Sequence, residues 1–194
     1  MRLAVTDLVE HASCPRRHWL ARRLRLPEPR AEAASGDDLA RATERGTLAH
    51  ALLAEVDLLA PPLARRALLR AVASRRGHDP GGAVARQVLR DVERFLDSES
   101  GRRLAAWERA GALRRALPFL LRLGGEPGCY LDGTIDALAV ERTTVWVVDF
   151  KYGAWGSGLA DRHRLQLLAY SLAASRAHPG RRVRAALQYL RGGA

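Results

Sequence analysis

Two aspartates and a lysine in the second half of the chain have the residue types and spacing of a hydrolytic metal site. Asp136 ends the segment 133–136 (GTID), and Asp149 and Lys151 lie in the segment 147–151 (VVDFK). Both aspartates lie in apolar, strand-like stretches, where a buried carboxylate is costly unless a cation compensates its charge. Carboxylates on adjacent strands offer the hard oxygen ligands that suit Mg²⁺ or Mn²⁺. The pattern therefore predicts a divalent-metal site with Asp136 and Asp149 as ligands.

Lys151 follows Asp149 by two residues, so on a strand both side chains point to the same face. Phe150 would point the other way, into the core, and leave its backbone carbonyl near the metal. A lysine in this place can stabilise the negative charge that grows on an attacked phosphate. The alternative is an ion pair between Asp149 and Lys151 at a strand end, which the D-x-K pattern fits better when taken alone.

Lys151 is also the only lysine among the 32 lysine and arginine residues of the chain. Arginine is a wide planar group that stays charged, whereas lysine is a compact ammonium on a flexible stem. By chance, a given basic position would hold the single lysine about one time in thirty. Its position therefore favours a site that needs a small point charge beside a reacting oxygen.

His50 is a candidate third ligand. It ends the segment 45–50 (RGTLAH), which we expect to open a helix. A histidine alone is weak evidence because imidazole suits Mn²⁺ better than Mg²⁺. Without further context, a surface or helix-packing role for His50 is favoured.

Gln166 and Tyr170 are four residues apart and so share one face of a predicted helix. They can contact a phosphate or a base edge while Leu165, Leu167 and Leu168 pack inward. An ordinary amphipathic helix is the alternative, and it is favoured without context.

The elements that must position these residues follow from hydrophobic periodicity and from glycine and proline breaks. We expect two short helical pieces over 5–20, a loop over 27–38, three helices between 39 and 96 broken at 61–62 and 78–82, and a short helix over 105–110. We expect strands at 116–121, 130–140, 143–150 and 183–190, a turn at 124–128, a glycine-rich loop at 153–158 and a helix over 161–176. This order predicts a mixed α/β fold.

Length and composition set further bounds. The 194 residues are enough for one globular domain, with 1–112 mainly helical and 113–194 containing the sheet. The last strand runs almost to residue 194, so we expect a fragment of a larger protein. Cys14 and Cys129 form neither a disulfide framework nor a zinc motif. No apolar run has membrane length and no secretory signal opens the chain, so we expect a cytoplasmic protein without a membrane partner.

The formal net charge is +11. Such a charge attracts polyanions, and nucleic acid is the expected partner. An arginine-rich proteome with a solvated basic surface explains the composition equally well.

In their order, five segments of the chain resemble the RecB-like branch of the PD-(D/E)XK nucleases, which includes the nuclease domains of AddA- and RecB-type helicase–nucleases. They are 6–17 (with its CPRR), 45–50 (GT-x-x-H), 133–136 (G-x-I-D), 148–151 (V-D-F-K) and 166–170 (Q-x-x-x-Y). The resemblance covers nearly the whole chain and implies a restriction-endonuclease-like core, a mixed central sheet flanked by helices.

The resemblance also implies roles for residues. His50, Asp136, Asp149 and the Phe150 carbonyl would hold Mg²⁺ or Mn²⁺, and Lys151 would be catalytic with the two aspartates. Gln166, Tyr170, Arg45 and Thr47 would contact DNA. Relatives with an iron–sulfur cluster pair the early cysteine with a C-terminal trio that this sequence lacks, so no cluster is expected. Tyr152 and Gly153 depart from the Thr/Ser and Gly that often follow the lysine, which puts local contacts in doubt.

The expected function is metal-dependent hydrolysis of DNA phosphodiesters, exonucleolytic end processing in double-strand break repair and recombination. No GxxxxGK[ST] motif occurs, so a helicase motor would be supplied in cis or in trans. Two alternatives stay open. One is a DNA-binding or scaffolding module on an inactive nuclease fold, and the other is a standalone nuclease of the CRISPR-adaptation or phage type.

Overall fold

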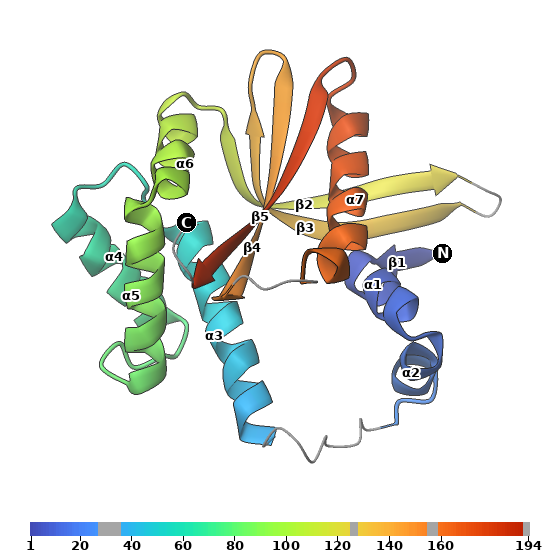
Figure 1. The fold of residues 1–194 in the computed structure, drawn as a ribbon, viewed down its shortest axis with the longest axis horizontal. Coiled ribbons are helices and arrows are strands. Elements are labelled where there is room, and N and C mark those ends of the chain that lie inside the picture. The colour runs from blue at the N-terminus through green and yellow to red at the C-terminus, as the bar shows by residue number, and fades with distance from the viewer. Residues whose placement is uncertain (27–35, 125–127, 155–158, 192–194) are drawn as a thin grey trace. The chain divides into compact units, whose positions relative to one another are not determined.

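Helices dominate the first part of the chain and strands the second, in a computed structural model that describes residues 1–26, 36–124, 128–154 and 159–191 (Figure 1). The first elements are β1 (Arg2–Ala4), α1 (Val5–Ser13), α2 (Pro15–His18), the π-helix η1 (Trp19–Arg23), α3 (Gly36–Glu55), α4 (Pro62–Arg75), α5 (Ala83–Asp97) and α6 (Glu99–Arg109). Then follow β2 (Leu113–Gly124), β3 (Cys129–Val140), β4 (Thr144–Ala154), α7 (Leu159–Ala177) and β5 (Arg182–Arg191).

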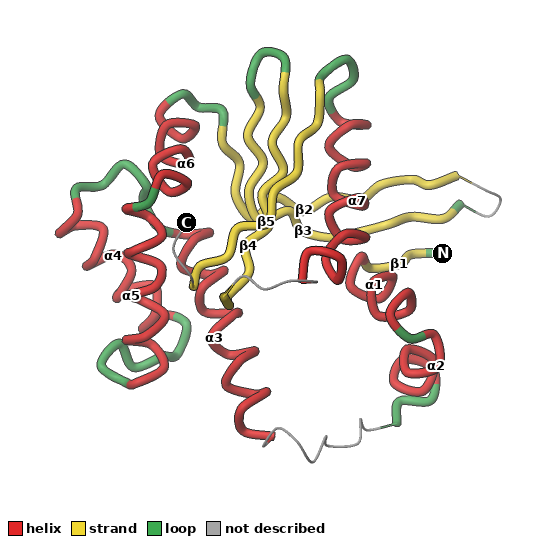
Figure 2. The backbone as a smooth tube through the Cα atoms, in the orientation of Figure 1, coloured by secondary structure: helices red, strands yellow, loops and turns green. Residues whose placement is uncertain are grey.

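The strands form one mixed sheet of five strands (Figure 2). The order is β1-β3-β4-β5, and β2 also pairs with β3. β1 runs parallel to β3, with Leu3 opposite Leu131. β3 runs antiparallel to β4, with Ala137 opposite Val148. This mixed sheet with its flanking helices confirms the predicted α/β class.

The chain divides into two compact units. The first contains β1, α1, α2, η1, β3 and α7, together with β2 from Ala116, β4 up to Asp149 and β5 up to Ala186. The second contains α3 to α6, β2 up to Arg115, β4 from Phe150 and β5 from Leu187. Three strands therefore contribute residues to both units, and the division in β4 falls between Asp149 and Phe150.

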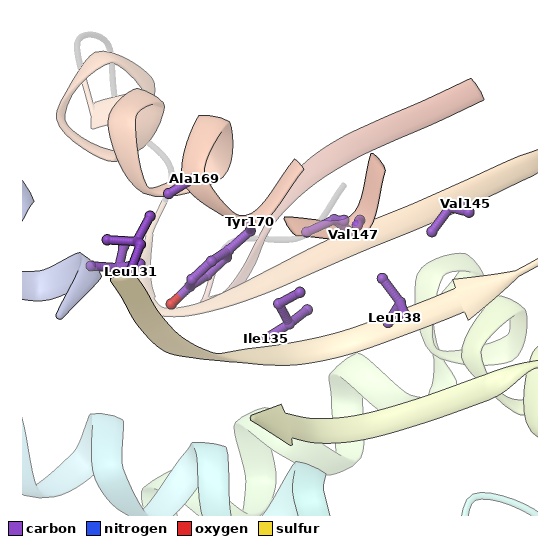
Figure 3. Packing of buried hydrophobic residues seen from close by; sticks show 9 residues of the cluster. Leu131, Ile135, Leu138, Val145, Val147, Ala169 and Tyr170 are labelled. Carbon is purple, nitrogen blue, oxygen red and sulfur yellow. The ribbon is translucent and has the colours of Figure 1, made fainter. Parts of the chain in front are cut away.

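The core of the first unit lies between α7 and the sheet. Figure 3 shows Leu131, Ile135 and Leu138 of β3 and Val145 and Val147 of β4 in one buried cluster with Ala169 and Tyr170 of α7. The β-branched and apolar residues of β4 explain why it is a central strand, because such side chains pack well on a pleated surface. This packing holds β3 and β4 in register under the helix.

The core of the second unit is made by α3, α4, α5 and α6, with α5 in contact with each of the other three. The buried face of α5 includes Val88, Val92 and Phe95 at helical spacing. Gly101, in the first turn of α6, lies very close to the end of α5, because an added Cβ would lie 2.3 Å from the carbonyl oxygen of Phe95. No helix within the described ranges is long and apolar enough to cross a membrane.

Most predicted helices are confirmed, with different ends. The break at Cys14-Pro15 separates α1 from α2, and Pro61-Pro62 and the segment 78–82 separate α3, α4 and α5. The helix expected at 105–110 is longer, since α6 begins at Glu99. Residues 36–38 were expected in a loop but begin α3. Residues 27–35 lie outside the described residues.

The strands are also confirmed, and two of them extend into residues that were expected in a turn or a loop. Gly124 ends β2, and Gly153 continues β4 instead of opening a loop. Residues 125–127 and 155–158 of the expected turns lie outside the described part of the chain. The short strand β1 was not expected, because its place in the sheet comes from pairing with β3, far away in sequence.

Candidate active site

Asp136 and Asp149 come to the same end of the β3–β4 ladder. The last pair of the ladder is Ala137 and Val148, and the two aspartates are the next residues on their strands. Asp149 is buried, with 2% of its surface exposed, and Asp136 is half-buried. The antiparallel pairing thus brings together the two acids that the sequence singled out.

Tyr170 of α7 lies close to both acids. Its pKa is raised, first by burial and further by the negative charges of Asp149 and Asp136, while the hydrogen bond from Gln166 lowers it. In Figure 3 the Tyr170 side chain extends from α7 toward β3, between Leu131 and Ile135. Helix α7 therefore covers the face of the sheet on which the carboxylates gather.

The acid pair has the chemistry of a cation site. The Asp149 carboxylate interacts with other described groups, and its buried Oδ2 atom retains acceptor capacity, because it accepts no hydrogen bond from a described residue. A buried carboxylate beside a second one is strongly stabilised by a bound cation. Two such groups fit a divalent ion that prefers oxygen ligands.

Lys151 lies on β4 two residues beyond Asp149, so the alternation of the strand directs both side chains to the same face. Phe150 lies between them and is 2% exposed. Its ring contacts that of Phe95 edge to face, with centroids 5.6 Å apart. The prediction that Phe150 points into the core is confirmed.

His50, Arg45 and Thr47 lie on α3, in the second unit. They lie well inside the helix, which begins at Gly36, so the expectation that segment 45–50 opens a helix is wrong. His50 is half-buried and Thr47 is exposed. No group of three or more histidine, cysteine, aspartate or glutamate side chains that could hold a metal ion occurs among the described residues. The structure thus brings together the two aspartates, and His50 stays a predicted ligand.

A family model described as the PD-(D/E)XK nuclease superfamily matches residues 2–193. The chain belongs to the PD-(D/E)XK nuclease superfamily. Its mixed sheet flanked by helices agrees with the restriction-endonuclease-like core of that superfamily. The search of curated proteins found no significant match. Members of the superfamily are typically dependent on divalent metals, and the pair Asp136 and Asp149 supplies carboxylate ligands of the right kind.

The two polar residues predicted on α7 differ in exposure. Tyr170 is buried, with 5% of its surface exposed, whereas Gln166 is half-buried. Gln166 Nε2 donates a hydrogen bond of 2.9 Å to the Tyr170 hydroxyl. Leu168 was expected to pack inward but is 56% exposed, because it lies on the opposite side of the helix from Ala169 and Tyr170, which fill the core. A role of Gln166 and Tyr170 at the DNA stays a prediction for this nuclease-superfamily chain.

One residue that sequence reasoning missed is Asp91 of α5, which is 1% exposed. Its carboxylate accepts a hydrogen bond of 2.8 Å from the hydroxyl of Tyr152, the residue after Lys151. Burial and this contact raise the pKa of Tyr152 to about 12, against the opposing charges of Arg191 and Arg45. The sequence did carry a signal, because Asp91 interrupts the apolar face that Val88 and Val92 define.

Proposed function

We propose that this member of the superfamily is a metal-dependent deoxyribonuclease that hydrolyses phosphodiester bonds. The observation that supports this most is the meeting of Asp136 and Asp149 at one end of the β3–β4 ladder, with Lys151 two residues further along β4. In a nuclease fold that has lost its activity, we would expect one or more of these groups to have been replaced. The chain retains both acids and its only lysine.

In this proposal Asp136 and Asp149 hold Mg²⁺ or Mn²⁺, together with the Phe150 carbonyl and His50. The ion supplies a concentrated positive charge near the scissile phosphate. Asp149 is the buried member of the acid pair, so packing fixes its position. The support for His50 and the carbonyl comes from the sequence motifs, and that for the acids also from the sheet register.

Lys151 stabilises the negative charge that grows on the phosphate as water attacks in line with the leaving oxygen. An ammonium group suits this role because it is compact and can reach a single oxygen, whereas a guanidinium would need a wider space. Phe150 orients the lysine by anchoring the strand on the opposite face, against Phe95.

DNA is the proposed substrate, and the net charge of +11 supports a polyanion. Arg45, Thr47 and Gln166 are the proposed contacts. Arg45 is half-buried, and an arginine side chain suits the recognition of a phosphate. Tyr170 is buried, so we assign it the support of Gln166.

The five sequence segments that resemble the RecB-like nucleases in their order support a narrower proposal. We place the chain in the RecB-like branch, as a single nuclease domain over 1–194 that processes DNA ends beside a helicase domain or subunit. Double-strand break repair is the setting that this branch implies. We expect no iron–sulfur cluster in this chain.

The test is a titration of Mg²⁺ and of Mn²⁺ with end-labelled single-stranded and double-stranded DNA. We expect cutting that requires the divalent ion and that releases nucleotides from an end. Asp136→Asn and Asp149→Asn should each lower the cleavage rate by about a hundredfold or more while DNA is still bound.

Asp132→Asn is the matched control. Asp132 lies on β3 near Asp136, but it pairs with Arg2 at 2.9 Å, a residue that is largely exposed. We expect its cleavage rate to equal that of the unaltered protein. DNA binding without cutting at saturating metal would instead support the inactive scaffolding module. Internal cutting of circular DNA would support a standalone nuclease.

A further inference from the structure

Two charged side chains are buried in the described part of the chain, Asp149 and Asp91. Asp149 belongs to the proposed metal site, whereas Asp91 is in the second unit, on α5. A buried carboxylate is costly unless several donors compensate it. The role of Asp91 can therefore be read from the groups that surround it.

Among the described residues, the groups that contact the Asp91 carboxylate all belong to the second unit. Gln87 Nε2 donates to both carboxylate oxygens at 3.0 Å, and Tyr152 donates at 2.8 Å. Arg94 Nη1 lies 3.3 Å from Oδ1, and Arg191 Nε of β5 lies 3.7 Å from Oδ2. The guanidinium of Arg191 also lies over the ring of Tyr152, 5.9 Å from its centroid. Asp91 thus joins α5 to β4 and to β5.

The contacts of β4 with α5 lie on both sides of Lys151 along the chain. Phe150, before the lysine, contacts Phe95 of α5, and Tyr152, after it, bonds to Asp91. Asp91 and Phe95 are four residues apart and so lie on the same face of α5. Phe150 and Tyr152 alternate with Lys151 and point to the opposite face of the strand. The two contacts fix the backbone of β4 where the lysine emerges.

We propose that Asp91 and Tyr152 are positioning residues for Lys151, a role that rests on the proposed nuclease function. The hydrogen bond holds the end of β4 on α5, so that the ammonium group is presented in one place. Lys151 is long and flexible, and a catalytic group that is displaced by about 1 Å can lose on the order of a hundredfold in rate. A polar anchor gives directional control that the Phe150 and Phe95 rings alone do not give.

The first variant is Tyr152→Phe, which removes one hydroxyl and keeps the ring beneath Arg191. We expect kcat to fall about tenfold or more, with the KM for DNA changed less than twofold, because substrate binding does not depend on Lys151 position. Tyr189→Phe is the matched control. Tyr189 is on β5, and its buried hydroxyl has no hydrogen-bond partner among the described residues, so we expect unchanged kcat.

The second variant is Asp91→Asn, which keeps the shape and removes the charge. We expect kcat to fall, because the hydrogen bond from Tyr152 loses its charged acceptor, and we expect the double variant to be no slower than Tyr152→Phe alone, because both changes act on one link. Asp97→Asn, on the same helix but exposed, is its control. Equal kcat in Tyr152→Phe and in the unaltered protein, both measured well below the midpoint of unfolding, would overturn the proposal.

A readout without activity separates this proposal from the nuclease assignment. Hydrogen–deuterium exchange at the amides of 150–154 should rise in Tyr152→Phe and stay unchanged in Tyr189→Phe. If the protein cuts no DNA under any metal condition, the nuclease proposal fails and so does the positioning role, even if the exchange difference appears. If it cuts DNA and exchange in β4 does not change in Tyr152→Phe, the positioning proposal alone fails.

Discussion

Gln166 Nε2 donates a 2.9 Å hydrogen bond to the hydroxyl of Tyr170, one turn further along α7. The sequence predicts that both side chains contact DNA, and in the structure they form a hydrogen bond with each other. Because the charges of Asp149 and Asp136 act on Tyr170 as well, the pair connects α7 to the acid end of the sheet. Helix α7 therefore helps to hold the end of the sheet where Asp136 and Asp149 lie.

Replacing Tyr170 by phenylalanine removes this link and leaves the ring in the core. We expect the free energy of unfolding to fall by about 0.5–1.5 kcal/mol, the usual contribution of one hydrogen bond. Urea denaturation followed by circular dichroism measures it. Tyr189→Phe, which removes a hydroxyl with no partner among the described residues, should cost nothing or stabilise slightly. An equal loss of stability in both variants would contradict this account of Tyr170.

Gly46 lies inside α3, where glycine is a poor helix former, and an added Cβ would meet no described atom within 4 Å beyond its neighbours and the backbone of its own helix. We expect Gly46→Ala to raise the free energy of unfolding by about 0.5–1 kcal/mol. Since Arg45 and Thr47 are proposed DNA contacts, the extra methyl group should also weaken DNA binding. Chemical denaturation and a DNA-binding titration measure the two effects. A less stable variant would show that the glycine serves the fold itself.

For Gly101 we predict the opposite effect of an alanine, a loss of stability. An added Cβ would lie 2.3 Å from the Phe95 oxygen and 2.5 Å from the Leu96 Cα, and neither backbone atom can move without shifting α5. We expect Gly101→Ala to destabilise the protein by at least about 1–3 kcal/mol, as overpacking of a core does. The thermal midpoint measured by scanning calorimetry should fall accordingly. Wild-type stability in this variant would mean that α5 and α6 are further apart.

Glu55, the last residue of α3, gives a prediction of pH dependence. Its pKa is lowered, first by the hydrogen bond from Arg76 and then by that from Arg75. A lowered pKa stabilises the fold above the ordinary pKa of glutamate, and this contribution is lost as the pH falls through the folded-state value. Glu55→Gln should therefore be less stable than the unaltered protein at pH 7, by at most about 1 kcal/mol because the pair is solvent-screened.

The difference between Glu55→Gln and the unaltered protein should shrink toward zero when unfolding is measured at pH 3. A gap that is constant from pH 7 to pH 3 would rule out the charge of Glu55 as its cause.

Local patterns predicted the elements best where one strong signal marks them. The apolar run that ends at Asp149 gave β4, and Pro61-Pro62 gave the start of α4. β1 was missed because its three residues have no pattern of their own and are a strand only through pairing with β3. The start of α3 was missed because Gly36 and the pair Asp37-Asp38 are typical of loops as well as of helix ends, so the residue types alone do not mark where the helix begins.

In the candidate site, too, some residues could be predicted from local patterns and others could not. Asp136 and Asp149 could be paired in advance, because each ends or lies within an apolar, strand-like segment and the two segments are neighbours in sequence. Asp91 could not be joined to Tyr152, because 61 residues separate them and only the packing of α5 on β4 brings them into contact. The exposure of Leu168 was not predictable from a helix in which leucines occur on both faces.

The most direct test of the central claim is the single-turnover cleavage rate of Lys151→Arg on end-labelled DNA at saturating Mg²⁺. The variant keeps the charge and loses the compact ammonium group, so we predict at least about a hundredfold slower cutting with DNA affinity changed less than threefold. Arg176→Lys, the reverse exchange at an exposed position of α7, is the control and should cut at the normal rate. A cleavage rate for Lys151→Arg equal to that of the unaltered protein would contradict the claim that Lys151 acts on the phosphate beside Asp136 and Asp149.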